Sequence, residues 1–161
     1  MQSKVKVLFI CHGNICRSTM AEMVFKHLLR QHNLNDCCIV DSAATSREEI
    51  GNGVHYGTRR KLAEVGIQCE EHYSVQMTKS DYKAYDYLIA MDDNNIRNMN
   101  RIIGHDPDGK VYKLLDFTYR KGESIADPWY TGNFDETYKD VWEGCNGLLD
   151  YLRKEYPVEF R

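Results

Sequence analysis

The sequence predicts an α/β fold in which a parallel sheet is covered by helices on both faces. Short apolar segments alternate with segments of helical periodicity along the chain, which is the pattern of strands joined by crossover helices. The first apolar segment, residues 5–10, is mainly β-branched and aromatic, as in a strand buried on both faces. We therefore expect a single domain over residues 1–161, a length sufficient to bury one core.

Four strands and four helices are expected in alternation. The strands are expected at residues 5–10, 38–42, 87–91 and 111–115. The helices are expected at residues 19–30, 58–65, 93–103 and 134–154, with the polar segment 45–57 as a loop. A capping box of Thr19 and Glu22 is expected to begin the first helix, and Trp142 is expected on the apolar face of the last.

Composition and charge exclude several classes of protein. The net charge is −3 and the isoelectric point about 6.1, so the chain lacks the basic field of a nucleic-acid-binding protein. No segment has the length of a membrane span or the pattern of an export signal, so we expect a cytoplasmic protein with no membrane partner. The six cysteines are then expected to be reduced thiols, without the paired spacing of a zinc site.

A cysteine and an arginine bracket a short loop directly after the first strand. Cys11 is followed by five residues and then Arg17, a spacing that wraps a tight loop around a tetrahedral oxyanion. Backbone N–H groups of such a loop converge on the anion, and the next helix adds the positive end of its dipole. Arginine binds two phosphate oxygens at once, and a thiol at the floor of the loop can act as a nucleophile. The loop therefore predicts a cysteine-dependent phosphatase.

The spacing alone is weak evidence, since about one random chain of this composition in three would contain it. Its context strengthens it. Gly13 gives the loop a position free of Cβ constraints, and the Ser18 hydroxyl can donate to the Cys11 thiolate and improve it as a leaving group. The Gly-Lys-Ser/Thr pattern of a Walker-type nucleotide loop is missing. These features favour a phosphate-ester site over a nucleotide site.

The segment Asp127-Pro128-Trp129-Tyr130 offers the second half of an active site. Thiolate attack on a phosphate ester needs a proton for the leaving oxygen, and a carboxylic acid near the site can supply it and later act as a base. Proline would stiffen this loop, and Trp129 and Tyr130 could form the walls of a pocket for a planar group. An isolated Asp-Pro is more often an ordinary surface turn, so Asp127 is predicted as an acid only because the chain also contains the Cys11–Arg17 loop.

With both segments in view, the whole chain resembles the low-molecular-weight protein tyrosine phosphatases, and more closely the bacterial members. Residues 11–18 fit the phosphate loop of that family, and residues 127–130 fit its general-acid loop. Segments 41–44 and 76–79 also resemble family positions. The resemblance implies a three-layer αβα fold around a four-stranded parallel sheet with flavodoxin-like or Rossmann-like order.

The resemblance also implies roles for individual residues. Cys11 would be the nucleophile, Arg17 the phosphate ligand and Asp127 the general acid and base, with no metal and no cofactor. Substrate contacts would come from eight residues: His12, Gly13, Asn14, Ile15, Cys16, Ser18, Trp129 and Tyr130. Asn14, Ser18, Ser42 and His72 would support the loop through hydrogen bonds. Cys16 would form a reversible disulfide with Cys11 that protects the nucleophile from over-oxidation.

The expected activity is the hydrolysis of phosphotyrosine in proteins through a phosphocysteine intermediate. The expected partners are phosphotyrosine proteins, a tyrosine kinase among them, and phosphate or other oxyanions as inhibitors. Three alternatives remain. The first is a protein arginine phosphatase, which commonly has threonine where this chain has Ile15. The second is an arsenate reductase, which would need further cysteines that residues 80–95 lack. The third is a non-catalytic phosphotyrosine-binding module, which would lack Cys11 or Asp127. Residues 46–52 are charged where eukaryotic relatives have aromatic residues, which leaves Trp129 and Tyr130 to pack the substrate ring.

Overall fold

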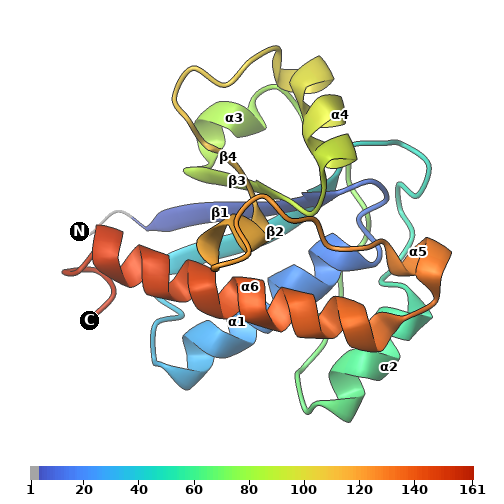
Figure 1. Cartoon of the computed structure of the whole chain (residues 1–161), viewed down its shortest axis with the longest axis horizontal. Coiled ribbons are helices and arrows are strands. Elements are labelled where there is room, and N and C mark those ends of the chain that lie inside the picture. The colour runs from blue at the N-terminus through green and yellow to red at the C-terminus, as the bar shows by residue number, and fades with distance from the viewer. Residues whose placement is uncertain (1–3) are drawn as a thin grey trace.

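The protein consists of a four-stranded parallel sheet between two layers of helices (Figure 1), as described by a computed structural model over residues 4–161. The strands are β1 (Val5–Cys11), β2 (Cys38–Ala44), β3 (Tyr87–Ala90) and β4 (Val111–Lys113). Their order in the sheet is β2-β1-β3-β4, and every neighbouring pair is parallel. This is the flavodoxin-like order, so the expected fold class is confirmed.

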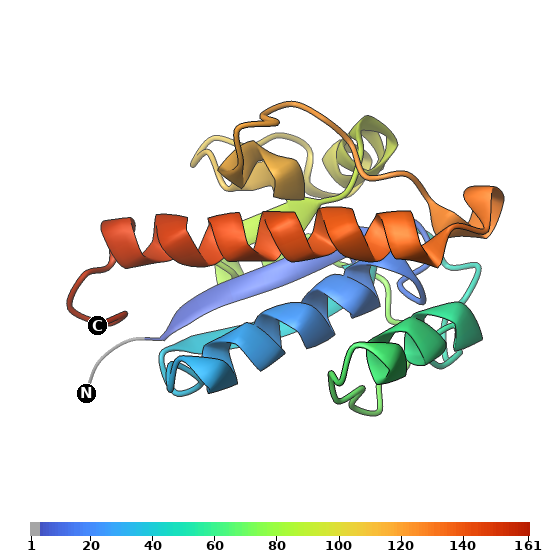
Figure 2. The same ribbon diagram turned by 60° about the horizontal axis from the view of Figure 1, so that its bottom comes forward.

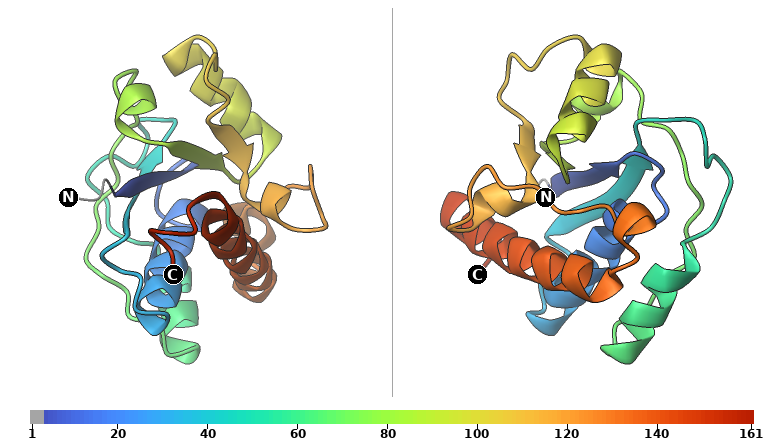
Figure 3. Two further views of the ribbon diagram at one scale, coloured as in Figure 1. Left: turned by 90° about the vertical axis from the view of Figure 1, so that its left-hand side faces the viewer. Right: turned by 45° about the vertical axis from the view of Figure 1, so that its right-hand side comes forward.

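The helices form two layers on opposite faces of the sheet. One layer contains α1 (Arg17–Gln31), α2 (Tyr56–Glu64) and α6 (Phe134–Glu155); the other contains α3 (Asp81–Ala84) and α4 (Asp93–Ile103). The left view of Figure 3 shows the strands between these layers, and Figure 2 shows α6 running beside α1. A 3₁₀ helix, η1 (Leu114–Phe117), follows β4, and a short helix, α5 (Pro128–Thr131), precedes α6.

The core divides at β1 according to the alternation of its side chains. Val7 and Phe9 pack into a cluster with residues of α1 and α6, whereas Leu8 and Ile10 pack into a second cluster with residues of α3 and α4. All four are at most 2 % exposed. A strand covered on both faces needs apolar residues at successive positions, which explains the continuous apolar segment in the sequence.

The chain order within the sheet creates a crevice at the carboxyl end of β1. From β1 the chain crosses to β2 on one side, while β3 lies on the other side of β1. The loops after β1 and β3 therefore leave the sheet edge in different directions, and ligands bind at such switch points in open α/β sheets. The Cys11–Arg17 loop lies at this crevice.

The expected start of the first helix is wrong. The helix begins at Arg17, after Cys16, and no side chain caps it. The Thr19 hydroxyl instead donates to the Cys16 carbonyl at 2.9 Å, and the Glu22 carboxylate accepts from the Ser42 hydroxyl at 2.5 Å. The first N–H groups of α1 are therefore left for a ligand in the loop, which a side-chain cap would have occupied.

Smaller differences concern element ends and short helices. Three short helices of four residues each, α3, α5 and η1, were not predicted from the sequence. The fourth strand ends at Lys113, because η1 begins at Leu114. Trp142 is 36 % exposed and packs beside Tyr138, so it does not belong to the buried face of α6. Among residues 4–161, no helix is long and apolar enough to cross a bilayer.

Candidate active site

Cys11 lies at the carboxyl end of β1 with its sulfur at the floor of the loop, and its side chain is buried. The backbone N–H of Asn14 is directed at the sulfur at 3.3 Å, and the backbone N–H of Ser18 at 3.4 Å. The Ser18 hydroxyl lies 3.0 Å from the same sulfur, as the sequence analysis expected. Three donors around one sulfur fix its position and are suited to hold a thiolate.

Asn14 holds the loop in a conformation that side chains rarely adopt. Its φ is 58°, in the left-handed region, whereas Gly13 has no positive φ. The conformational freedom expected of Gly13 is therefore required at Asn14. Gly13 serves a different purpose: a Cβ there would lie 3.3 Å from Cγ of Glu49, so the small residue makes room for that side chain.

A buried hydrogen-bond network compensates for the strained backbone of Asn14. Its Nδ2 donates to the hydroxyls of Ser18, at 2.8 Å, and Ser42, at 2.9 Å. Its Oδ1 accepts from Nε2 of His72 at 2.8 Å and from the backbone N–H of Val75 at 3.3 Å. The four loop-supporting residues expected from the sequence thus lie together, behind the loop.

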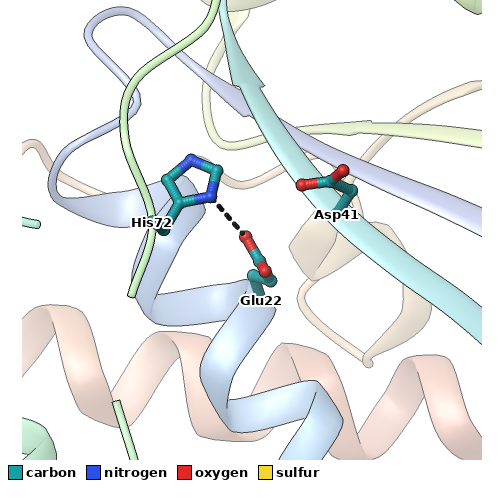
Figure 4. A group of neighbouring side chains, drawn as sticks. All are labelled: Glu22, Asp41 and His72. Carbon is teal, nitrogen blue, oxygen red and sulfur yellow. Dashed lines mark ion pairs between the residues drawn. The ribbon is translucent and has the colours of Figure 1, made fainter. Parts of the chain in front are cut away.

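Glu22 extends this network below the loop. Its Oε1 accepts from Ser42 and lies 3.5 Å from Nδ1 of His72, and its other oxygen binds Lys26 at 2.7 Å. Figure 4 shows His72 and Glu22 directed toward one another, with Asp41 on the neighbouring strand β2. Glu22 was expected to be a helix-capping residue, and no local pattern in the sequence indicates its contact with β2.

Glu22, Asp41 and His72 also place one potential metal-ligand atom each within 4.8 Å of the other two. Each already has a hydrogen-bond partner, because Glu22 binds Ser42 and Lys26, His72 binds Asn14, and Asp41 accepts from the Ser42 N–H at 2.8 Å. The donor set therefore fits loop support better than metal binding.

Arg17 is almost completely buried, with 2 % of its side chain exposed. Its Nη1 donates to Oδ2 of Asp92 at 2.6 Å and to the Ile125 carbonyl at 2.8 Å, while Nη2 lies 3.4 Å from Oδ2 of Asp127. Burial acts to lower the pKa of the guanidinium, but the negative charges of Cys11, Asp92 and Asp127 raise it above its ordinary value. The group stays charged and fixed in one orientation.

Asp92 is a further residue of the site that was not predicted from the sequence. It lies two residues after the end of β3 and caps α4, because its carboxylate accepts from the backbone N–H of Asn95 at 2.8 Å. A carboxylate just beyond the carboxyl end of a parallel strand is a recognisable signal, since these ends meet at one edge of the sheet.

Asp127 is held at the N-terminus of α5, opposite Arg17. Its Oδ1 accepts from the backbone N–H of Trp129 at 3.0 Å, and Pro128 occupies the first position of the helix. Its Oδ2 faces Arg17, and the side chain is 22 % exposed. The carboxylate is thus positioned by its own backbone and stays accessible from the cavity.

Cys11, Arg17 and Asp127 share one cavity of about 100 Å³. Six of the eight expected substrate-contact residues belong to segment 12–18, and four of these six line the cavity: His12, Gly13, Ile15 and Cys16. Asn14 and Ser18 are fully buried and belong to the supporting network behind the loop. Glu48 and Glu49, from the charged segment, complete one wall.

Trp129 and Tyr130 form the aromatic side of the cavity mouth, with 58 % and 83 % of their surfaces exposed. Trp129 packs edge-on against His55, with ring centroids 5.8 Å apart, and His55 stacks on Phe134 at 5.3 Å. On the opposite side, Nε2 of His12 lies 2.7 Å from a Glu48 carboxylate oxygen. One wall is therefore aromatic and the other carries carboxylates.

Cys16 lies in the same loop as a buried free thiol and precedes α1. Burial raises the pKa of the Cys16 thiol to about 12, and the negative charge of Cys11 adds to the effect. Cys16 therefore stays protonated at neutral pH. Of the two loop cysteines, Cys11 is the one surrounded by donors.

Comparison with known proteins places these features in a family. The family described as low molecular weight phosphotyrosine protein phosphatase matches residues 6–158. The protein named low molecular weight protein-tyrosine-phosphatase YfkJ of Bacillus subtilis is 37% identical over 152 residues, which cover 94% of this chain and 97% of that protein. The low molecular weight protein-tyrosine-phosphatase PtpA of Staphylococcus aureus is 35% identical over 151 residues, which cover 94% of this chain and 96% of that protein.

Solved structures agree with the sequence comparison. The crystal structure of YfkJ from Bacillus subtilis superposes with a TM-score of 0.92 at 36% identity and covers 96% of this chain and 98% of that chain. The structure of a low molecular weight protein tyrosine phosphatase from Streptococcus pyogenes gives a TM-score of 0.84 at 38% identity, over 98% and 99% of the two chains.

Proposed function

The chain belongs to the low molecular weight phosphotyrosine protein phosphatase family, and we propose that it hydrolyses phosphotyrosine in proteins through a phosphocysteine intermediate. One observation carries the proposal: Asp127, 110 residues after Arg17, lines the same cavity as Cys11 and Arg17. A nucleophile, a fixed cation and a carboxyl group around one hollow are the parts that phosphoryl transfer to a thiolate requires.

In the first step the thiolate of Cys11 attacks phosphorus, and the bond from phosphorus to the phenolic oxygen breaks. Asp127 gives its proton to that oxygen, so the substrate leaves as neutral tyrosine. Arg17 and the loop N–H groups hold the three remaining phosphate oxygens, where negative charge spreads in the transition state. The ion pair with Asp92 keeps Arg17 in place while this happens.

In the second step water attacks the phosphocysteine. The Asp127 carboxylate accepts a proton from the water, the bond from phosphorus to sulfur breaks, and Cys11 departs as a thiolate. The Ser18 hydroxyl, 3.0 Å from the sulfur, donates to it as this charge returns. Inorganic phosphate remains in the loop, so phosphate and similar oxyanions are expected to inhibit.

The same loop supports a protective redox step. Oxidation of the Cys11 thiolate by a peroxide gives a sulfenic acid and water or an alcohol. The Cys16 thiol then displaces water from that sulfur to form a disulfide, which a cellular dithiol reduces back to two thiols. The support for this step is the position of both thiols on one cavity. A nucleophile that must be reduced also favours a reducing compartment such as the cytoplasm.

Phosphotyrosine is favoured over phosphoarginine by two features of the cavity. Ile15 presents an apolar side chain where the alternative activity is associated with threonine, and Trp129 and Tyr130 offer aromatic surface to a ring. The physiological substrates are phosphotyrosine proteins, and a kinase phosphorylated on its own tyrosines belongs to that class.

The test is steady-state hydrolysis of matched phosphotyrosine and phosphoarginine peptides. Cys11→Ser is expected to abolish turnover, and Cys69→Ser, outside the cavity, is the matched control. Asp127→Asn keeps an acceptor for the α5 cap but has no proton to give, so it is expected to slow phosphotyrosine hydrolysis by about 10²–10⁴-fold. The loss should shrink for an ester with a more acidic phenol, which needs less protonation.

Undiminished turnover by Cys11→Ser would refute the mechanism. Faster turnover of the phosphoarginine peptide by the wild-type enzyme would refute the substrate and leave the mechanism standing.

A further inference from the structure

Helix α4 carries a polar and basic stripe that begins beside the catalytic cavity. Asn94, Arg97, Asn98 and Arg101 recur at intervals of three and four residues, which places them along one face of the helix. Met99 and Ile103 are buried on the other side. Figure 1 and the right view of Figure 3 show α4 leaving the sheet close to the loop after β1. The stripe therefore leads outward from the proposed catalytic centre.

A second cavity, of about 300 Å³, joins this stripe to the catalytic groups. Asn94 and Asn98 line it on the helix side, and Tyr130 lines it on the side of α5. Arg17 and Asp127 line both this cavity and the first one. A chain whose phosphotyrosine enters the first cavity can thus continue into the second.

The two arginines of the stripe keep unused positive charge. Arg97 donates to the side-chain oxygen of Asn94, and Arg101 to that of Asn98 at 3.4 Å. Within residues 4–161 neither guanidinium lies within ion-pair distance of a carboxylate, although Asp93 on the same helix pairs with Lys113 at 2.9 Å. A guanidinium has five N–H donors, so one neutral acceptor leaves most of them available.

The opposite rim of the mouth carries the opposite charge. Glu48 and Glu49 line the first cavity, and in the described chain neither pairs with a lysine or an arginine. An acidic side chain of a substrate would be repelled from this rim and attracted to the α4 stripe. The two rims together would fix the direction in which such a peptide crosses the mouth.

We propose that the α4 stripe binds an acidic residue of the substrate that lies close to the phosphotyrosine in sequence, either before it or after it. This inference rests on the proposed function. From Asn94 to Arg101 the helix rises through seven steps of ~1.5 Å, about 10 Å in all. An extended peptide covers that distance in about three residues. The stripe is therefore long enough to contact the three peptide positions on one side of the phosphotyrosine.

The test compares kcat/KM for three phosphotyrosine peptides that differ only in their flanks: neutral on both sides, glutamate at the three preceding positions, or glutamate at the three following positions. Wild type is expected to favour one of the two acidic peptides over the neutral one by about three- to tenfold, and the preference should weaken at high salt. The double substitution Arg97→Gln/Arg101→Gln should bring this ratio close to one. Arg97→Glu/Arg101→Glu should reverse it, so that the acidic peptide becomes the poorer substrate.

The matched control is Arg153→Gln/Lys154→Gln, which removes two positive charges at the far end of α6 and should leave the ratio unchanged. Because each variant is judged by a ratio of two substrates, a loss of folded enzyme does not imitate the effect. Equal turnover of all three peptides by wild type, or a ratio that survives charge reversal, would overturn the inference. Absence of turnover on every phosphotyrosine peptide would instead overturn the proposed function.

Discussion

Replacing Asn14 by alanine should remove the hydrogen bonds that support the loop. The substitution changes none of the side chains that line the cavity. The Asn14 side chain is completely buried and makes four hydrogen bonds, two as donor and two as acceptor. Alanine makes none of them and still has to adopt a φ of 58°. The substitution therefore removes a buried network and keeps the backbone strain.

The expected cost follows from these two contributions. The N–H groups of Val75 and His72 lose their acceptor; because both bonds are only partly buried, we take about 1–2 kcal/mol for each group. The hydroxyls of Ser18 and Ser42 suffer less, because Cys11 and Glu22 remain as partners. A left-handed alanine adds about 1 kcal/mol. We expect Asn14→Ala to lower the free energy of unfolding by about 3–5 kcal/mol.

Two further variants separate the contributions. Asn14→Gly loses the same bonds without the left-handed penalty, so it should be about 1 kcal/mol more stable than Asn14→Ala. Asn33 also has a positive φ, 57°, but is exposed and makes no side-chain hydrogen bond within the described residues. Asn33→Ala should therefore cost only about 1 kcal/mol.

The assay is urea denaturation of the four proteins, with kcat/KM for phosphotyrosine measured on the folded fraction. Activity should fall in both Asn14 variants and stay unchanged in Asn33→Ala. If Asn14→Ala were no less stable than Asn33→Ala, the assignment of the network as the support of the loop would be refuted.

Two other predictions concern the aromatic wall and acid stability. A Cβ on Gly57 would lie 2.4 Å from the Phe134 ring, which stacks on His55 beside Trp129. Gly57→Ala should therefore lower the free energy of unfolding by about 1–3 kcal/mol and raise KM. Adding Phe134→Leu to Gly57→Ala should recover stability, as measured by thermal unfolding. Partial burial opposes ionisation of Asp106, but hydrogen bonds from Tyr82 and from backbone N–H groups lower its pKa below the ordinary value. A lowered pKa stabilises the fold above the unfolded pKa of about 3.9 and ceases to do so as pH falls through the folded value. Asp106→Asn should thus lower the free energy of unfolding by about 1–2 kcal/mol at pH 7 and by progressively less below about pH 4. Urea denaturation at a series of pH values measures this difference. A difference that does not change with pH would contradict the assignment.

Features that depend on neighbouring residues could be predicted from the sequence. The strand before Cys11 follows from its apolar run, and the helix over residues 93–103 coincides with α4 because Asp92 and Asn95 cap it locally. The alternation of strands and helices predicted the parallel sheet, and the spacing from Cys11 to Arg17 predicted the position of the anion loop. The signals for the strand, for α4 and for the loop are each contained in a short segment, and only their alternation extends along the whole chain.

Features that depend on contacts between distant segments were decided by the tertiary structure. The capping box at Thr19 and Glu22 looked complete in the sequence, but Glu22 binds Ser42 on β2, because burial beside the loop makes that hydroxyl a necessary partner. Gly13 looked like the flexible position, but the left-handed residue is Asn14, whose strain is accepted only because His72 and Val75 supply its hydrogen bonds.

By itself, the sequence determined the fold class and the three chemical groups of the proposed site, because strand pattern and residue type are local properties. Only the tertiary structure decided how those groups are held. Arg17 lies between Asp92, 75 residues away, and Asp127, 110 residues away. The physical reason is the parallel sheet, which brings the carboxyl ends of β1 and β3 to one edge. Charges distant in sequence meet there, and the buried cation Arg17 is stable only because carboxylates lie beside it.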